Sequence, residues 1–172
     1  MLVSGCDLFQ VREPQPPSQG SSTHEVQSSS ASVLRNLKSS IAEYNIDNYI
    51  TCLVDSSVRP FVFVPSSYYA VFNSWGIESE RQYFLNLGAP AAGTPPSLTL
   101  TMQDSTVTAD SVRYSMSYRL FFPHHRSDVA KTVIGNMQLY LLRESHGLWF
   151  IYRWEDSRTT TDSTWSYLKA SF

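Results

Sequence analysis

The apolar residues of this chain change their spacing near residue 97, from one every three or four residues to one every second residue. Before the change, Val33, Leu37 and Ile41 recur every fourth residue, which predicts a helix over Val33–Tyr44 with one apolar face. After it, apolar and polar residues alternate from Val112 to Phe122, a pattern typical of a half-buried strand. Helices that precede a set of strands predict an α+β domain, with the helices packed on one face of a curved sheet.

Turn residues and changes of period mark the other predicted elements. Helices are expected near Asp47–Leu53, Ser66–Phe72 and Ile77–Leu87, and strands at Phe61–Val64, Leu98–Met102, Val133–Leu141 and Leu148–Trp154. Short connections after residue 97 predict an antiparallel sheet of about four strands. Ser30 or Ser32 is expected to cap the first helix and Asp47 the second, because their side chains can accept from free backbone N–H groups. Gly135 is expected to mark a bulge.

Residues 1–6 indicate a location, because Val3-Ser-Gly-Cys6 resembles a bacterial lipobox. In a lipobox, small residues precede a cysteine that receives diacylglycerol and becomes the mature N-terminus, so Cys6 is the predicted lipidation site. A secretory signal also needs an apolar run, and only Leu2 and Val3 precede the small residues. Either the start codon is assigned too late, or the sequence was trimmed, or the four-residue match arose by chance.

The stretch that follows is rich in Pro, Gln and Ser. Such a composition cannot bury enough apolar surface to fold, so residues 7–30 are predicted to be a flexible spacer. The predicted organisation is a remnant of a lipoprotein signal at 1–6, this spacer at 7–30, and one domain at 31–172 that the spacer holds away from a membrane.

Charge, apolar run length and cysteine content limit the kinds of partner and of covalent bond that this chain can have. The net charge is −2 and no cluster of Lys and Arg stands out, which argues against nucleic acid as a partner. No apolar stretch has the length of a transmembrane helix. If Cys6 carries lipid, Cys52 is left as a small buried hydrophobe, and a Cys6–Cys52 disulfide is the alternative.

Two groups of residues resemble a known superfamily. The helix Val33–Tyr44, the pairs Asn48-Tyr49 and Asp55-Ser56, and the strand Phe61–Pro65 look like the opening of the NTF2-like (cystatin-like α+β) superfamily. The segments Trp149–Asp156 and Thr164–Ala170 resemble the last strand and tail of small uncharacterised NTF2-like bacterial lipoproteins, which often begin as Ser4–Phe9 does here. The resemblance implies a cone-shaped fold in which a bent sheet wraps around two or three helices.

The same resemblance raises the question of catalysis, since the superfamily includes isomerases, dehydratases and cyclases with an Asp or His base and a Tyr or acid donor. No matching motif is present, and no carboxylate is expected alone among apolar residues on a strand. The tyrosines of the apolar series are expected to be core residues: Tyr114, Tyr118 and Tyr152. The acidic candidates are expected to be turn, cap or ion-pair residues: Asp55, Asp104, Asp110 and Glu155-Asp156. No catalytic residue is assigned.

Metal and cofactor chemistry finds no support in the sequence. His124-His125 are expected to form a solvated loop pair, because adjacent residues of an extended segment point to opposite sides. His146 and Asp128 lie near other turns. No phosphate-binding glycine loop, Cys-x-x-Cys pair or His-Glu-x-x-His run is present, so neither a metal nor a cofactor is predicted.

The sequence therefore predicts a non-catalytic, lipid-anchored domain of the bacterial envelope, facing the periplasm, that binds a ligand or assembles with itself. Its partners would be the membrane through Cys6, a small apolar ligand, and a second copy through the exposed sheet face. The residues expected to line a pocket are Tyr114, Met116, Tyr118, Met137 and Trp154. The alternatives are a pocket enzyme that acts on a small apolar substrate, and a structural envelope component whose core is too full for any ligand.

Overall fold

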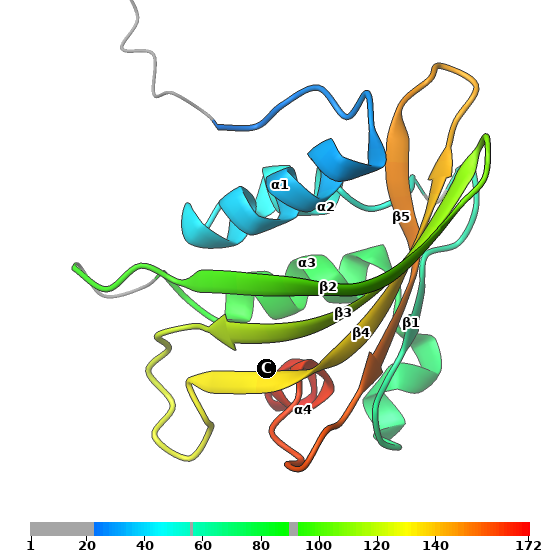
Figure 1. Cartoon of the computed structure of the whole chain (residues 1–172). Coiled ribbons are helices and arrows are strands. Elements are labelled where there is room, and N and C mark those ends of the chain that lie inside the picture. The colour runs from blue at the N-terminus through cyan, green and yellow to red at the C-terminus, as the bar shows by residue number, and fades with distance from the viewer. Residues whose placement is uncertain (1–22, 56, 90–92) are drawn as a thin grey trace, which may run out of the picture.

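The computed structural model describes residues 23–55, 57–89 and 93–172. The helices are α1 (Ser30–Ala42), α2 (Ile46–Thr51), the 3₁₀ helix η1 (Ala70–Ser74), α3 (Ile77–Asn86) and α4 (Trp165–Ser171). The strands are β1 (Val62–Val64), β2 (Ser97–Val107), β3 (Ser111–Phe121), β4 (Thr132–Arg143) and β5 (Trp149–Ser157). Figure 1 shows the long strands bending as one sheet, with α1, α3 and α4 gathered on one side of it.

The strands form one mixed sheet in the order β1-β5-β4-β3-β2. The last four are antiparallel neighbours, as predicted, whereas β1 adds a fifth strand parallel to β5. The residues that follow α2 already bond to β5. The N–H of Val54 donates to the carbonyl of Ile151, and the N–H of Ile151 donates to the carbonyl of Cys52. The segment after α2 therefore already runs along β5 before β1 begins.

The residues that cap the first two helices lie before the predicted ones, Ser30 or Ser32 for α1 and Asp47 for α2. Ser29 caps α1, since its Oγ accepts from the N–H of Ser32 at 3.1 Å, and the Ser32 Oγ accepts from the N–H of Ser29 at 3.2 Å. Asn45, and not Asp47, caps α2 by accepting from the N–H of Asn48 at 3.0 Å. In both cases the residue with extended backbone just outside the helix takes the role.

Gly135 lies in regular pairing opposite Tyr118, so the bulge predicted there is absent. The register shifts lie instead between Met102 and Asp104 and between Tyr140 and Leu141. A Cβ at position 135 would lie 2.5 Å from the hydroxyl oxygen of Tyr118 and 2.8 Å from the carbonyl oxygen of Ser157. Glycine is required at this position because the Tyr118 side chain crosses over it.

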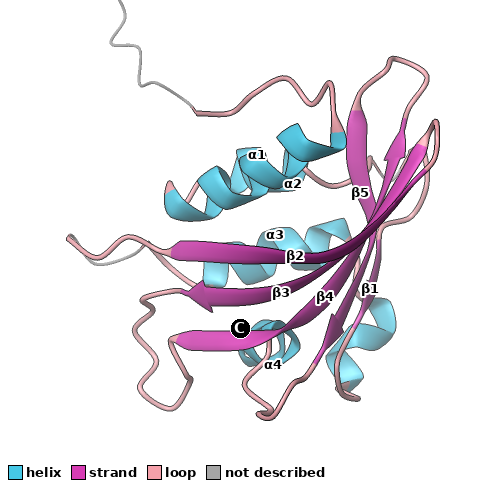
Figure 2. Ribbon diagram, viewed as in Figure 1, coloured by secondary structure: helices cyan, strands magenta, loops and turns pink. Residues whose placement is uncertain are grey.

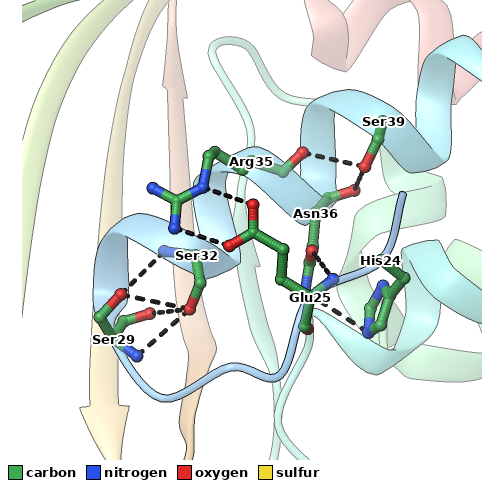
Figure 3. Close-up of polar contacts among 7 residues, drawn as sticks. All are labelled: His24, Glu25, Ser29, Ser32, Arg35, Asn36 and Ser39. Carbon is green, nitrogen blue, oxygen red and sulfur yellow. Dashed lines mark hydrogen bonds and ion pairs between the residues drawn. The ribbon is translucent and has the colours of Figure 1, made fainter. Parts of the chain in front are cut away.

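Residues 23–29, which the sequence analysis places in the spacer, lie against the domain and are termed the N-terminal segment below. Figure 3 shows this segment beside α1. The carboxylate of Glu25 accepts two hydrogen bonds from Arg35, at 2.8 and 2.7 Å. The backbone of Glu25 exchanges two further bonds with the side chain of Asn36, each 2.8 Å long. The segment is therefore bound to one face of α1, and residues 7–22 of the predicted spacer lie outside the described part.

Gln27 joins the N-terminal segment to the sheet. Its side-chain amide donates to the carbonyl of Thr51 at 2.7 Å, and its own carbonyl accepts from the N–H of Trp149 at 2.9 Å. The residue is 6% exposed. Since α2 and β5 both contact it, the packed part of the chain begins before residue 31.

The core fills the space between the bent sheet and the helices. Figure 2 separates the helices, in cyan, from the strands, in magenta. The buried positions of β4 alternate strictly, and Val33, Leu37 and Ile41 of α1 pack against the same core, as their spacing predicts. Within the described ranges, no helix is long and apolar enough to cross a membrane.

Candidate functional site

The residues that the sequence predicts to line a pocket share the helix-covered face of the sheet. Met116 and Met137 lie opposite each other on β3 and β4, and each is 1% exposed. Trp154 and Tyr118 are buried as well, whereas Tyr114 is half-buried with its hydroxyl 2.8 Å from the Ser30 Oγ. The structure brings these side chains into one core, and none of them lines the groove described below.

The centre of this core holds a buried ion pair that the sequence analysis did not identify. The ammonium of Lys169, on α4, donates to the carboxylate of Glu80, on α3, and both side chains are 0% exposed. The same carboxylate accepts from the hydroxyl of Tyr49 at 2.8 Å and from the indole N–H of Trp75 at 2.7 Å. Every partner of Glu80 is thus a donor, which is what a buried carboxylate requires.

Aromatic rings surround the other side of the ammonium. Lys169 Nζ lies 3.8 Å from the ring centroid of Phe63 and 4.3 Å from that of Trp154. The rings of Trp75 and Tyr83 each lie 5.8 Å away. These faces attract a cation by their quadrupoles, so the chain provides an aromatic cage for its own lysine.

Burial shifts the titration of this cluster. Burial lowers the pKa of Lys169, and the Glu80 carboxylate opposes that shift. Burial raises the pKa of the Tyr49 and Tyr83 hydroxyls, and the Glu80 charge raises both further. Solvent does not reach Lys169 or Glu80, and their ion pair joins α4 to α3.

A second polar network fixes the start of α4. Asp156, at the end of β5, accepts from the hydroxyl of Tyr118 at 2.7 Å and from the N–H and hydroxyl of Ser166 at 2.7 and 2.5 Å. The Tyr118 oxygen in turn accepts from the N–H of Trp165 at 2.6 Å. The expectation that no strand carries a carboxylate among apolar residues is therefore wrong for Asp156, which is 4% exposed. Its role is to hold α4 against the sheet.

The histidine pair and the second cysteine differ in burial. His125 is exposed, whereas His124 is 3% exposed and packs 5.0 Å from the ring of Phe172, so only one of the pair is solvated. Among the described residues, no group of three or more His, Cys, Asp or Glu side chains lies close enough to hold a metal ion. Cys52 is a buried free thiol, and burial raises its pKa to about 12.

The open face of the sheet carries polar and aromatic side chains. Gln138 and Tyr140 of β4 alternate with buried residues and pair with Glu155 and Arg153 of β5. The rings of Tyr140 and Tyr152 lie 6.2 Å apart, and Arg153 donates to Glu155 at 2.6 Å. Tyrosine and arginine are enriched in protein interfaces, so this face, termed the outer face below, has the composition of a contact surface.

A groove of about 450 Å³ lies between the end of α2, the start of α3 and the β4–β5 turn. Its lining residues are Ile50, Thr51, Leu53, Val54, Asp55, Ile77, Glu144 and Phe150. The groove is mainly apolar, and the charged residues that line it within the described ranges, Asp55 and Glu144, are both acidic. Sequence reasoning missed it because its walls come from three separated segments.

Sequence comparisons identify no family for this chain. No protein-family model matches it, and no curated protein matches it significantly. The fold, in contrast, matches many solved structures.

Three of these structures illustrate the likeness. An NTF2-like protein of unknown function from Shewanella oneidensis MR-1 gives a TM-score of 0.54 at 13% identity, over 74% of this chain and 94% of that one. An NTF2-like superfamily protein from Salmonella enterica serovar Typhimurium LT2 gives 0.56 at 11%, over 76% and 88%. A ketosteroid isomerase-like protein from Erwinia carotovora atroseptica SCRI1043 gives 0.53 at 13%, over 76% and 93%. The chain therefore has the NTF2-like fold that its sequence predicts, and at these identities the likeness concerns the fold alone.

Proposed function

We propose that this NTF2-like domain is a lipid-anchored protein of the bacterial envelope that acts without catalysis, by binding or assembling through its surface. The observation that carries the proposal is the filled interior of the domain. The Glu80–Lys169 pair and the rings around it occupy the space between the helices and the sheet.

A pocket enzyme needs a concave site that encloses most of its substrate next to a reactive group. In this chain the two buried carboxylates of the interior are already bonded to other interior groups: Glu80 to three donors, and Asp156 to Tyr118 and Ser166. Opening the interior would leave these groups unpaired, which costs free energy for each one. A role at the surface is therefore favoured over the alternative of an enzyme with a central pocket.

The anchoring part of the proposal rests on the sequence of residues 3–6. Cys6 would carry the lipid, and residues 7–22 could span at most about 55 Å before the chain meets the domain. The N-terminal segment is bound along α1 and held to α2 and β5 through Gln27. A tether attached there would leave the outer face free for a partner, including a second copy of the chain.

The anchor is tested by metabolic labelling. The gene is expressed from its genomic locus in bacteria that are fed an alkyne fatty acid, beside a Cys6→Ser variant as the matched control. We expect the wild-type protein to carry the label and to be found in the membrane fraction, and the variant to carry no label. An unlabelled wild-type protein would overturn the anchor.

The surface role is tested by native mass spectrometry of the 172-residue Cys6→Ser chain. A filled interior predicts the mass of the chain or a multiple of it, with no molecule held inside. A dimer that Tyr140→Ser converts to a monomer would identify the outer face as the contact. A molecule that is released only on denaturation, and is retained by groove variants such as Glu144→Gln, would favour the pocket enzyme instead.

A further inference from the structure

The groove beside α2 has walls that are held in place by backbone hydrogen bonds. Leu53 and Val54, on one side, are fixed by the bridge of Leu53 to Ile151 and by the bond from the N–H of Val54 to the Ile151 carbonyl. On the other side, the N–H of Glu144 donates to the carbonyl of Leu148 within the β4–β5 turn. The groove is thus a formed feature of the fold, and its volume of about 450 Å³ lies within the range of small-molecule sites.

The charges that line the groove have one sign. Asp55 and Glu144 are acidic, and within the described ranges no Lys, Arg or His side chain lines it. The Asp55 carboxylate accepts from the N–H of Ser57 at 2.7 Å, and hydrogen bonds from Ser57 lower its pKa, so Asp55 is ionised at neutral pH. An anionic ligand would be repelled from the groove, and a cation would be attracted to it.

An unpaired acceptor indicates where such a cation would bind. The Oε1 atom of Glu144, a lining residue, is buried and has no hydrogen-bond partner in the part of the chain that the structure describes. A buried oxygen atom of this kind is normally bonded, so a ligand that donates an N–H hydrogen bond would satisfy it.

We propose that this groove binds a small organic cation, a primary ammonium group carried on an apolar body. Ile50, Ile77 and Phe150 would contact the apolar body, and the carboxylates of Glu144 and Asp55 would hold the ammonium. A neutral apolar ligand would leave Glu144 Oε1 unpaired, so the charged head provides the selectivity. The inference rests on the non-catalytic binding role proposed above and names its ligand class.

The test uses three probes that share one apolar chain and differ in the head group: n-hexylammonium, n-hexanol and hexanoate. Each is titrated into the ¹⁵N-labelled 172-residue Cys6→Ser chain and followed by NMR. The expected result is saturable shifts with hexylammonium at the amides of residues 50–55 and 144–150, far weaker shifts with hexanol, and none with hexanoate.

Variants separate the carboxylates from general hydrophobic binding. Glu144→Gln and Asp55→Asn should each weaken hexylammonium binding roughly tenfold, since each removes a charged hydrogen-bond partner. Glu155→Gln is the matched control, because Glu155 is similarly half-buried and pairs with Arg153 on the outer face. Equal binding of hexanol and hexylammonium, no saturable shifts, or unchanged binding in Glu144→Gln would each overturn the inference. None of these outcomes affects the labelling or oligomer results that test the proposed function.

Discussion

The hydroxyl of Tyr118 donates to the carboxylate of Asp156 at 2.7 Å and accepts from the backbone N–H of Trp165 at 2.6 Å. One side chain of β3 thereby joins the end of β5 to the start of α4. Burial and the Asp156 charge both raise the pKa of this hydroxyl, so it stays protonated and keeps donating at neutral pH. Because Lys169 lies on α4, the bonds that hold α4 against the sheet also hold Lys169 in the interior of the domain.

Tyr118→Phe should therefore destabilise the domain by about 2–4 kcal/mol, because it removes a bond to a charged group and leaves a buried backbone donor unpaired. Urea denaturation followed by tryptophan fluorescence measures the loss. Tyr114→Phe is the control, since Tyr114 lies on the same strand, is half-buried and bonds a neutral group, the Ser30 hydroxyl. Equal losses in the two variants would show that the Tyr118 network contributes nothing specific.

Lys169→Met should cost about 3–5 kcal/mol, because it leaves the Glu80 carboxylate charged and buried without its cation. Adding Glu80→Gln should recover much of this loss, since the neutral amide oxygen can still accept from the Trp75 indole N–H, and the amide NH2 can donate to the Tyr49 oxygen. The two single variants and the double variant form a cycle, measured by urea denaturation. Additive losses would contradict a coupled pair. Arg158→Met, in an exposed pair with Asp162, should change little.

The order of α1, α2, α3 and the four long strands follows from local patterns, and the structure confirms it, whereas the sequence analysis did not predict α4. Apolar spacing predicts a helix with Val33, Leu37 and Ile41 on its buried face, and alternation predicts β3. These patterns are local because each residue is compared with neighbours a few positions away. The parallel pairing of β1 with β5 could not be predicted in this way, because it joins segments far apart in the sequence.

The buried ion pair was missed for a related reason. Charged residues are usually assigned to the surface, and Glu80 and Lys169 stand 89 positions apart. One signal was available: Glu80 lies three residues after Ile77 and four before Phe84, so it shares the apolar face of α3. A lone carboxylate on such a face predicts a buried partner, although the spacing cannot say that Lys169 provides it.

The start of the folded part is tested by two shortened chains. A chain that begins at Thr23 should be as stable as the whole chain, because it keeps the bonds that Glu25 and Gln27 make to α1, α2 and β5. A chain that begins at Ala31 should lose about 3 kcal/mol, from the Ser29 cap and the two hydrogen bonds of Gln27. Thermal unfolding followed by circular dichroism compares them. Equal stability of the two shortened chains would mean that residues 23–30 belong to the spacer. As a control, Glu25→Ala should barely change the midpoint of thermal unfolding, because the ion pair of Glu25 with Arg35 is exposed.

Alkaline pH should destabilise the domain, starting near pH 9. Burial raises the pKa of Cys52 from 9.0 to about 12, and raises those of Tyr49, Tyr83 and Tyr118 above 10.0. The folded state therefore keeps protons that the unfolded state loses, so stability present below pH 9 is lost as the pH rises, by up to about 1.4 kcal/mol per group and pH unit. Lys169 acts oppositely, because burial lowers its pKa from 10.5.

The midpoints of urea denaturation, measured at pH 7, 9 and 10.5, should fall above pH 9. The fall between pH 9 and 10.5 should be less steep in Cys52→Ala. A midpoint that does not change up to pH 10.5 would mean that these groups titrate as they do in the unfolded chain.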